Sequence, residues 1–240
     1  MVMFSFRSVA LLAVVLFVGA VSAGCGMGWG GVDTSYHPDI NPANFGTVVD
    51  NPYMPLVPGT VYTYSEKAEG KVFKNVTTVT KETKVVMGVT CIVVHDTVSL
   101  GDQLKEDTFD WYAQDKQGNV WYLGEDTTEY LANGKTSKAG SWEGGVNGAY
   151  PGIMMPAKAE PGPEYRQEYK AGEAEDMGQI VAVSETVKVP YGELKECLKT
   201  KDWSMLEAGC EYKWYAKGVG VVREETSDGE IAELLEVTKP

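Results

Sequence analysis

In this 240-residue chain, the carboxylates of Asp96, Asp107 and Glu125 have a spacing that could support ligand binding or acid–base catalysis. Each lies in a segment of alternating apolar and polar residues close to a short turn, a pattern that predicts a β-strand. If the strands pair as their turns indicate, the three side chains meet at one end of one sheet face. Carboxylates that lie so close repel one another unless a cation or the nearby Lys105 compensates their charge.

Two turns set this predicted pairing. The segment at residues 115–119 is typical of a type I turn followed by a left-handed glycine, and residues 101–102 form a two-residue hairpin turn. The cross-strand pairs that follow are Gln114–Val120, Phe109–Glu125 and Asp96–Asp107. Alternation then predicts one apolar core face, made of Ile92, Val94, Val98, Leu100, Phe109, Trp111, Ala113, Trp121 and Leu123, with the three carboxylates at its end. A slip of one residue in either turn would separate them.

The grouped carboxylates allow three kinds of site. They could bind calcium, which prefers carboxylate oxygens and is the one cofactor the sequence suggests, with Asp96, Asp107 and Glu125 as metal ligands. They could act as a general acid and base in a hydrolase, or anchor a ligand in the mouth of a barrel. The alternative is that the sheet frays at this point and the side chains are solvated strand ends.

The longest segment without strand character, residues 143–163, is predicted to be a loop that covers an opening in the sheet. It is too apolar for a disordered linker, and it begins next to Trp142 and contains Tyr150. These two aromatic residues join the carboxylates as predicted ligand-binding residues, since aromatic side chains can pack on a sugar or a lipid.

The N-terminal 24 residues have the form of a signal peptide, with Arg7 before an apolar segment and small residues before Gly24. Residues 22–25 also resemble a bacterial lipobox, which predicts lipidation of Cys25 and a membrane anchor. Cleavage before Gly24 as a soluble secreted protein is the other interpretation. Residues 25–58 are predicted to be a tether and an irregular arm, and residues 59–240 a single β domain.

The net charge of the chain narrows the classes of molecule that it could bind. The net charge of -13, from 21 basic and 34 acidic residues, argues against nucleic acid as a binding partner and against contact with a membrane other than through Cys25.

Because an exported protein can form disulfides, Cys197 and Cys210 are predicted to form a disulfide that closes a loop between neighbouring strands.

Turn residues recur every 8–12 positions between β-branched segments from Thr60 onward, and no segment has a helical apolar period. The chain is therefore predicted to be all-β, an antiparallel meander that forms a strongly curved sheet, an open barrel or a sandwich.

Residues 110–115 and 118–125 spell DWYAQD and GNVWYLGE. With them the chain resembles an uncharacterised family of secreted or lipid-anchored bacterial proteins rich in β-structure that carry a DWYAQD…GNVWYxGE segment. Further stretches, among them residues 51–56, 91–96 and 151–156, extend the resemblance over most of the chain. The resemblance implies export and a β fold, and no activity.

The function these observations favour is that of an exported, lipid-anchored envelope protein, not an enzyme, that binds a small-molecule, lipid or glycan ligand in a cleft. Two alternatives remain at this point. One is a carboxylate-based hydrolase of envelope or extracellular glycans, and the other is a non-catalytic envelope scaffold.

Overall fold

The computed structural model describes residues 35–240. Apart from one 3-10 turn, Pro42–Asn44, every regular element in this range is a β-strand, as the β-branched and alternating segments predict. No helix among these residues is long and apolar enough to cross a membrane. The predicted signal peptide, Cys25 and the glycine-rich segment that follows it lie outside the described residues.

The strands, in chain order, are β1 (Val49–Asn51), β2 (Met54–Leu56), β3 (Val61–Ala68), β4 (Lys71–Val86), β5 (Val89–Leu100), β6 (Gln103–Gln114), β7 (Val120–Tyr130), β8 (Thr136–Ser137), β9 (Trp142–Glu143), β10 (Tyr150–Met155), β11 (Tyr165–Arg166), β12 (Glu168–Tyr169), β13 (Asp176–Val189), β14 (Gly192–Ser204), β15 (Glu211–Ala216), β16 (Gly220–Thr226) and β17 (Ile231–Thr238).

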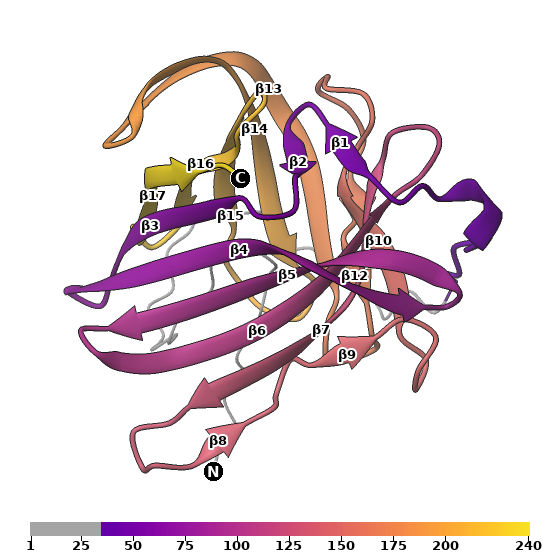
Figure 1. Cartoon of the computed structure of the whole chain (residues 1–240), viewed down its shortest axis with the longest axis horizontal. Helices are drawn as coiled ribbons and strands as arrows, with labels where there is room; N and C mark the ends of the chain where they lie inside the picture. Colours follow the sequence, from indigo (N-terminus) through magenta and orange to yellow (C-terminus); the bar gives the residue numbers. More distant parts are fainter. Residues whose placement is uncertain (1–34) are drawn as a thin grey trace.

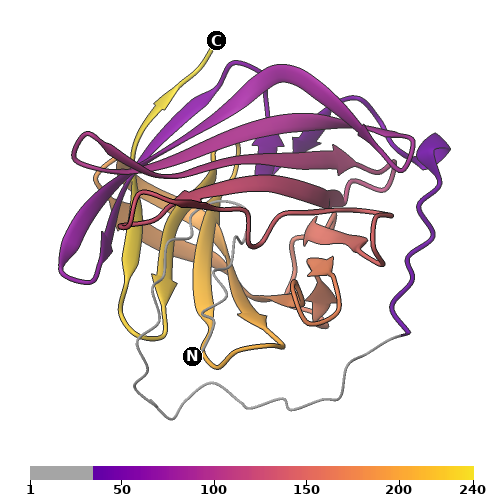
Figure 2. The same ribbon diagram turned by 90° about the horizontal axis from the view of Figure 1, so that it is seen from below.

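These strands form one antiparallel meander that curls into a nearly closed barrel (Figures 1 and 2). The order around the sheet is β11-β13-β14-β15-β16-β17-β3-β4-β5-β6-β7-β10-β12, with β8 and β9 paired to β7. Strands β11 and β12 are neighbouring parts of one stretch, and they pair with β13 and β10 respectively. This stretch therefore links the two ends of the sheet, and the predicted open barrel is confirmed.

Alternation along the strands buries every second side chain in the barrel. In β3, Tyr62, Tyr64 and Glu66 are buried, and Thr63 and Ser65 between them are partly exposed. The principal hydrophobic core lies on this inner face and includes Tyr112, Tyr122 and Leu234. Interior-facing residues of a small barrel fill its lumen in this way.

A second, smaller core lies on the outer face of β5, β6 and β7. There Trp111 and Leu123 pack with Val93, and Ile40 and Phe45 of the N-terminal segment cover them. Both faces of this part of the sheet are thus buried, the inner one in the barrel and the outer one under the N-terminal arm.

The arm contains more regular structure than predicted, because β1 and β2 form a hairpin that lies across one end of the barrel (Figure 1). The backbone amides of Asp50 and Asn51 donate to Gln114 Oε1 at 2.9 and 2.8 Å. On the other side of the opening, the Gly218 amide donates to the Pro52 carbonyl at 2.7 Å. The hairpin thereby connects the end of β6 with the turn between β15 and β16.

The predicted lid at residues 143–163 is wrong. Its middle is strand β10, which pairs with β7 on one side and with β12 on the other. The apolar residues that indicated a cover over the sheet are part of the sheet, and Met154 and Met155 are buried in the core.

The predicted disulfide between Cys197 and Cys210 is also wrong, since Cys197 is a buried free thiol. In the β14–β15 hairpin, Leu198 pairs with Tyr215 and Asp202 pairs with Glu211. Cys197 therefore lies at the open end of the paired region and Cys210 next to the turn. With about 3.3 Å per strand residue, the two positions are too far apart for a disulfide, which needs Cα atoms within about 7 Å.

Two β-bulges change the predicted registers. The turn at residues 101–102 is as predicted, but an extra residue, Lys105, shifts the pairing so that Asp96 faces Thr108 and Asp107 faces Thr97. In the next hairpin, the pair Gln114–Val120 is confirmed. Between the pairs Tyr112–Tyr122 and Asp110–Glu125, β7 has one residue more than β6. Glu125 therefore pairs with Asp110 and not, as predicted, with Phe109. A bulge moves all later side chains of its strand to the opposite face.

The consequence is that the predicted core face is divided. Phe109, Trp111, Ala113, Trp121 and Leu123 belong to the outer core under the arm. The lumen is lined instead by Ile92, Val94, Tyr112 and Tyr122. Glu125 reaches the lumen because the bulge at Gly124, whose φ is +140°, reverses its side.

Candidate functional site

Polar side chains cross the inner face of strands β4 to β7. The register places Thr77 beside Asp96, Asp96 beside Thr108, and Thr108 beside Thr127. All four are buried, and the Thr108 and Thr127 hydroxyls lie 2.6 Å apart. On either side of this row the same strands carry further buried carboxylates. We call the five carboxylates of β5, β6 and β7 the acidic wall: Asp96, Glu106, Asp110, Glu125 and Glu129.

Asp96 is held by two hydrogen bonds from β4. Its Oδ1 accepts from Asn75 Nδ2 and its Oδ2 from Thr77 Oγ1, both at 2.6 Å. Burial raises the pKa of Asp96 from 3.8 to about 6, although both hydrogen bonds lower it. The free-energy cost of removing the charged carboxylate from water therefore exceeds the stabilisation that the two hydrogen bonds provide.

Asp110 and Glu125 lie directly opposite each other on β6 and β7. Tyr122 donates to Asp110 Oδ1 at 2.8 Å, yet burial, and then the charge of Asp96, raise the pKa of Asp110 to about 8. Burial and the same neighbouring charge raise the pKa of Glu106 well above its ordinary value. Asp110 and Glu106 therefore bind protons more tightly than ordinary carboxyl groups do.

The opposite wall, on β14, β15 and β16, contains a buried lysine among carboxylates. Lys213 Nζ lies 3.4 Å from Glu211 Oε2 and 3.7 Å from Asp202 Oδ2, and Glu224 is its cross-strand neighbour. Burial lowers the pKa of Lys213, but these three carboxylates outweigh it and hold the pKa well above its usual value. Lys213 is therefore charged and is already balanced within its own wall.

Three aromatic rings lie next to the acidic wall. Tyr112 stacks on Tyr122 with centroids 5.0 Å apart, and Trp142 meets Tyr122 edge-on at 5.2 Å. Trp142 is also the cross-strand neighbour of Glu125. We call Tyr112, Tyr122 and Trp142 the aromatic group.

Two polar atoms of the aromatic group have no hydrogen-bond partner within residues 35–240: the Tyr112 hydroxyl and Trp142 Nε1. Tyr112 is fully buried, and Trp142 is 4% exposed. Burial raises the pKa of Tyr112, and the charges of Asp110, Glu125 and Tyr215 raise it further. Leaving a buried donor unpaired costs about 1–3 kcal/mol, and such groups require an explanation.

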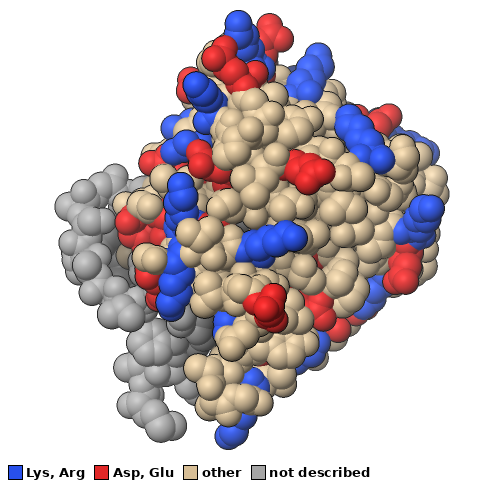
Figure 3. Space-filling model, turned by 60° about the vertical axis from the view of Figure 1, so that its left-hand side comes forward, with Lys and Arg blue, Asp and Glu red and all other residues tan. Residues whose placement is uncertain are grey.

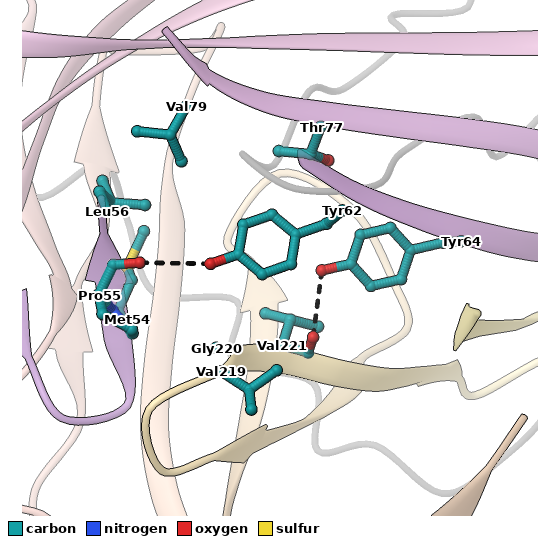
Figure 4. Close-up of a pocket in the computed structure, with 10 residues that line it drawn as sticks. All are labelled: Met54, Pro55, Leu56, Tyr62, Tyr64, Thr77, Val79, Val219, Gly220 and Val221. Atoms are coloured by element: carbon teal, nitrogen blue, oxygen red, sulfur yellow. Dashed lines mark hydrogen bonds between the residues drawn. The ribbon is translucent and has the colours of Figure 1, made fainter. Parts of the chain in front are cut away.

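A small cavity in the barrel lies beside β2 and borders the polar row through Thr77 (Figure 4). Leu56, Tyr62, Tyr64 and Thr77 are among the residues that line it, and its volume of about 20 Å³ has room for water rather than for a ligand. Tyr62 donates to the Pro55 carbonyl and Tyr64 to the Val221 carbonyl, at 3.4 and 3.1 Å. The tyrosine hydroxyls at this cavity are thus satisfied, unlike that of Tyr112.

The outer surface differs from the lumen in charge. On the face seen in Figure 3, basic and acidic side chains are interspersed. Several form ion pairs there or elsewhere on the exterior, such as Arg223 with Glu233 at 3.1 Å and Lys84 with Glu143 at 2.7 Å. Mixed charges of this kind favour solubility, whereas the buried carboxylates of the lumen are gathered on two opposite walls.

The structure brings three of the five predicted ligand-binding residues to the lumen. Asp96, Glu125 and Trp142 are buried there. Asp107 lies on the opposite face of β6, where its Oδ1 contacts His95 Nε2 at 2.5 Å. Tyr150 lies at the pairing of β10 with β12 and stacks on Tyr169 with centroids 6.2 Å apart. The predicted grouping of Asp96, Asp107 and Glu125 is therefore wrong, because the bulge at Lys105 turns Asp107 outward.

The described part of the chain contains no group of three or more His, Cys, Asp or Glu side chains that could hold a metal ion. Calcium ordinarily needs six to eight oxygen ligands at about 2.3–2.6 Å. The carboxylates of the acidic wall are instead distributed along three strands, and the predicted calcium has no assembled ligand set among these residues.

Sequence reasoning missed Glu106, Asp110, Lys213 and Glu224 as site residues. The alternation of Glu106, Thr108, Asp110 and Tyr112 is visible in the sequence, but the more polar face of an antiparallel strand ordinarily faces solvent. Lys213 and Glu224 gave no signal of their own, since charged residues in strands are usually exposed.

The fold and the lumen define an antiparallel β-barrel protein with a carboxylate-rich interior. No family model matches the chain, and no curated protein matches it. Two solved structures are similar to it. One is a candidate exported protein with a YmcC-like fold from Bacteroides fragilis NCTC 9343, with 18% identity, a TM-score of 0.46, and coverage of 78% of this chain and 99% of that chain.

The second is a candidate lipoprotein from Parabacteroides distasonis ATCC 8503, with 14% identity, a TM-score of 0.42 and the same coverage. The strand order of this chain defines its fold.

Proposed function

We propose that this is an exported protein of the cell envelope, anchored through Cys25, that binds a ligand in the lumen of its barrel without changing it chemically. The N-terminal signal-like segment and the lipobox support export and anchoring. The observation that carries the binding function is the pair of buried, unpartnered donors, the Tyr112 hydroxyl and Trp142 Nε1. A ligand that accepts from both would offset their desolvation.

Replacement of Tyr112 tests this function. Tyr112→Phe removes a hydroxyl that has no partner, and it is expected to raise the free energy of unfolding of the ligand-free protein by about 1 kcal/mol. The matched control is Tyr64→Phe, which leaves the Val221 carbonyl without its donor at 3.1 Å and is expected to cost about 1 kcal/mol. Urea denaturation measures both.

Native mass spectrometry of the protein purified without denaturation provides the second measurement. We expect a non-covalent adduct on the wild type that is weaker or absent on Tyr112→Phe. If Tyr112→Phe is as destabilising as Tyr64→Phe, and no adduct is seen, the hydroxyl has a structural role and the binding function is refuted.

A further inference from the structure

We infer that the outer face of β14 and β15 docks on the surface of the membrane that holds the lipid anchor, where its lysines meet anionic lipid head groups. This inference rests on the anchoring at Cys25 in the proposed function, and it adds the surface of the barrel that lies against the membrane. We call the residues concerned the basic aromatic face: Lys199, Lys201, Trp203, Tyr212 and Trp214.

Strand alternation directs the five residues of the basic aromatic face to the outside of the barrel. They alternate along β14 and β15 with inward-facing residues such as Asp202 and Lys213, which are buried. All five are partly exposed. The outward Trp111 of β6, by contrast, is buried in the outer core that the N-terminal arm covers. Of these two outer faces, the one on β14 and β15 is therefore the accessible one.

The basic aromatic face is positively charged, although the chain as a whole is acidic. Within residues 35–240 neither Lys199 nor Lys201 forms an ion pair, and the cross-strand neighbours of both lysines are uncharged. On the next strand, the outward Glu225 is paired with Arg223 at 3.0 Å. The net charge of -13 predicts no membrane contact other than through the anchor, but that total is a sum over the whole surface. Anionic lipid attracts a local group of lysines at close range.

The rings of this face fit a membrane surface better than a sugar. Lys199 Nζ lies 4.2 Å from the ring centroid of Tyr212 and 4.4 Å from that of Trp214. Arg223 approaches Trp214 from the strand on the other side, at 5.7 Å. Cations thus occupy the ring faces on which a sugar would have to pack. Tyr and Trp are also the side chains enriched at membrane–water interfaces, where they lie among the head groups.

The beginning of the described chain lies near the same face. Eleven residue steps separate Cys25 from Tyr36, and an extended chain covers at most about 40 Å in that number. Tyr36 packs on Arg166 of β11, whose guanidinium is 5.4 Å from the ring centroid. Arg166 pairs with Met177 of β13, and Met177 pairs with Trp203. Because neighbouring strands are only about 4.8 Å apart, an anchor at Cys25 keeps the basic aromatic face within reach of the membrane.

Vesicle flotation of the full mature chain tests the inference, with Cys25→Ser in every sample so that no acyl chain contributes to binding. The vesicles contain phosphatidylcholine alone or with about 30% phosphatidylglycerol. We expect the protein to partition onto the anionic vesicles at least about tenfold more strongly than onto the neutral ones. Lys199→Gln/Lys201→Gln should weaken partition onto the anionic vesicles by about twenty-five-fold, or about fivefold for each lysine.

The matched control is Lys74→Gln/Lys81→Gln. It removes the same charge from two exposed lysines of β4, five strands further along the sheet from β14, and its partition should equal that of the parent protein. Thermal unfolding of both double variants shows whether each is folded. The comparison of neutral with anionic vesicles needs neither variant, so it decides the question even if a variant is unstable.

Equal binding to the two kinds of vesicle, no binding to either, or equal loss of binding in the two double variants would each overturn docking through this face. Retention on immobilised alginate without binding to vesicles would also overturn it, and would assign the face to an acidic glycan. The anchor is judged separately, by the mass of the wild type extracted from bacterial membranes, which should include acyl chains on Cys25.

Discussion

Neutralisation of Asp96 gives the sharpest test of the buried acidic wall. The pKa of Asp96 rises from 3.8 to about 6 on folding, so the folded state binds a proton more tightly than the unfolded state. The stability from this group is fully present below pH 3.8 and is lost as the pH rises through about 6. A difference of about two pKa units corresponds to about 3 kcal/mol. Asp96→Asn, which is neutral at every pH, should not lose this amount.

We therefore expect Asp96→Asn to match the wild type near pH 3.5 and to be more stable by about 3 kcal/mol at pH 8. The amide can replace the carboxylate in the network: its oxygen accepts from Asn75 Nδ2, and its nitrogen donates to the Thr77 hydroxyl, which in turn donates to Asn75 Oδ1 at 3.2 Å. Thr77 and Asn75 thus keep partners, and no cavity forms.

Urea denaturation of the ligand-free protein between pH 3.5 and 8 measures this effect, with m compared between variants so that a changed unfolded state is recognised. The control is Asp102→Asn, the same substitution in the exposed turn between β5 and β6, for which we expect the pH dependence of the wild type. If the difference between Asp96→Asn and the wild type is the same at both ends of the range, the reasoning on burial is refuted.

Three further changes test other parts of the barrel. Lys213→Met should lower the free energy of unfolding, measured by urea denaturation, by about 3–5 kcal/mol, because it leaves buried carboxylates uncompensated. The double variant Lys213→Met/Glu224→Gln should be more stable than Lys213→Met alone, because it removes one of these carboxylates. Gly124→Ala should cost at least about 1–3 kcal/mol, because φ is +140° and a Cβ would lie 2.5 Å from the Trp142 carbonyl oxygen; an unchanged thermal midpoint would contradict the assigned bulge. Cys197 should react with a thiol reagent only after unfolding, and non-reducing peptide mapping should yield no Cys197–Cys210 cross-link.

Turn chemistry predicted much of the fold and part of the register. The glycine turn at residues 115–119 and the two-residue turn at 101–102 gave the correct pairs next to each turn, because loop length and turn type fix the first pairs of a hairpin. The errors began where a bulge added one residue, at Lys105 and at Gly124. Neither bulge has a decisive signal in the sequence, since Lys105 is an ordinary strand residue and Gly124 could equally end a strand.

The wrong choice of core face had a different cause. Trp111 and Leu123 are apolar, and Asp110 and Tyr122 on the opposite face are more polar, so alternation alone assigned the first pair to the interior. In this barrel the N-terminal arm supplies Ile40 and Phe45 to cover the apolar face, and the polar face turns into the lumen. A covering segment far away in the sequence cannot be read from the pattern of the strands it covers.

The polar interior is therefore better explained by function than by stability. Burying Asp96 and Asp110 raises the pKa of each, which means that the fold is less stable at neutral pH than it would be with uncharged residues at these positions. Buried ion pairs and carboxylates are often replaceable by apolar residues without loss of stability. Carboxylates that weaken the empty barrel agree with the proposed binding of a ligand in the lumen, where a bound partner would offset the cost of burying them.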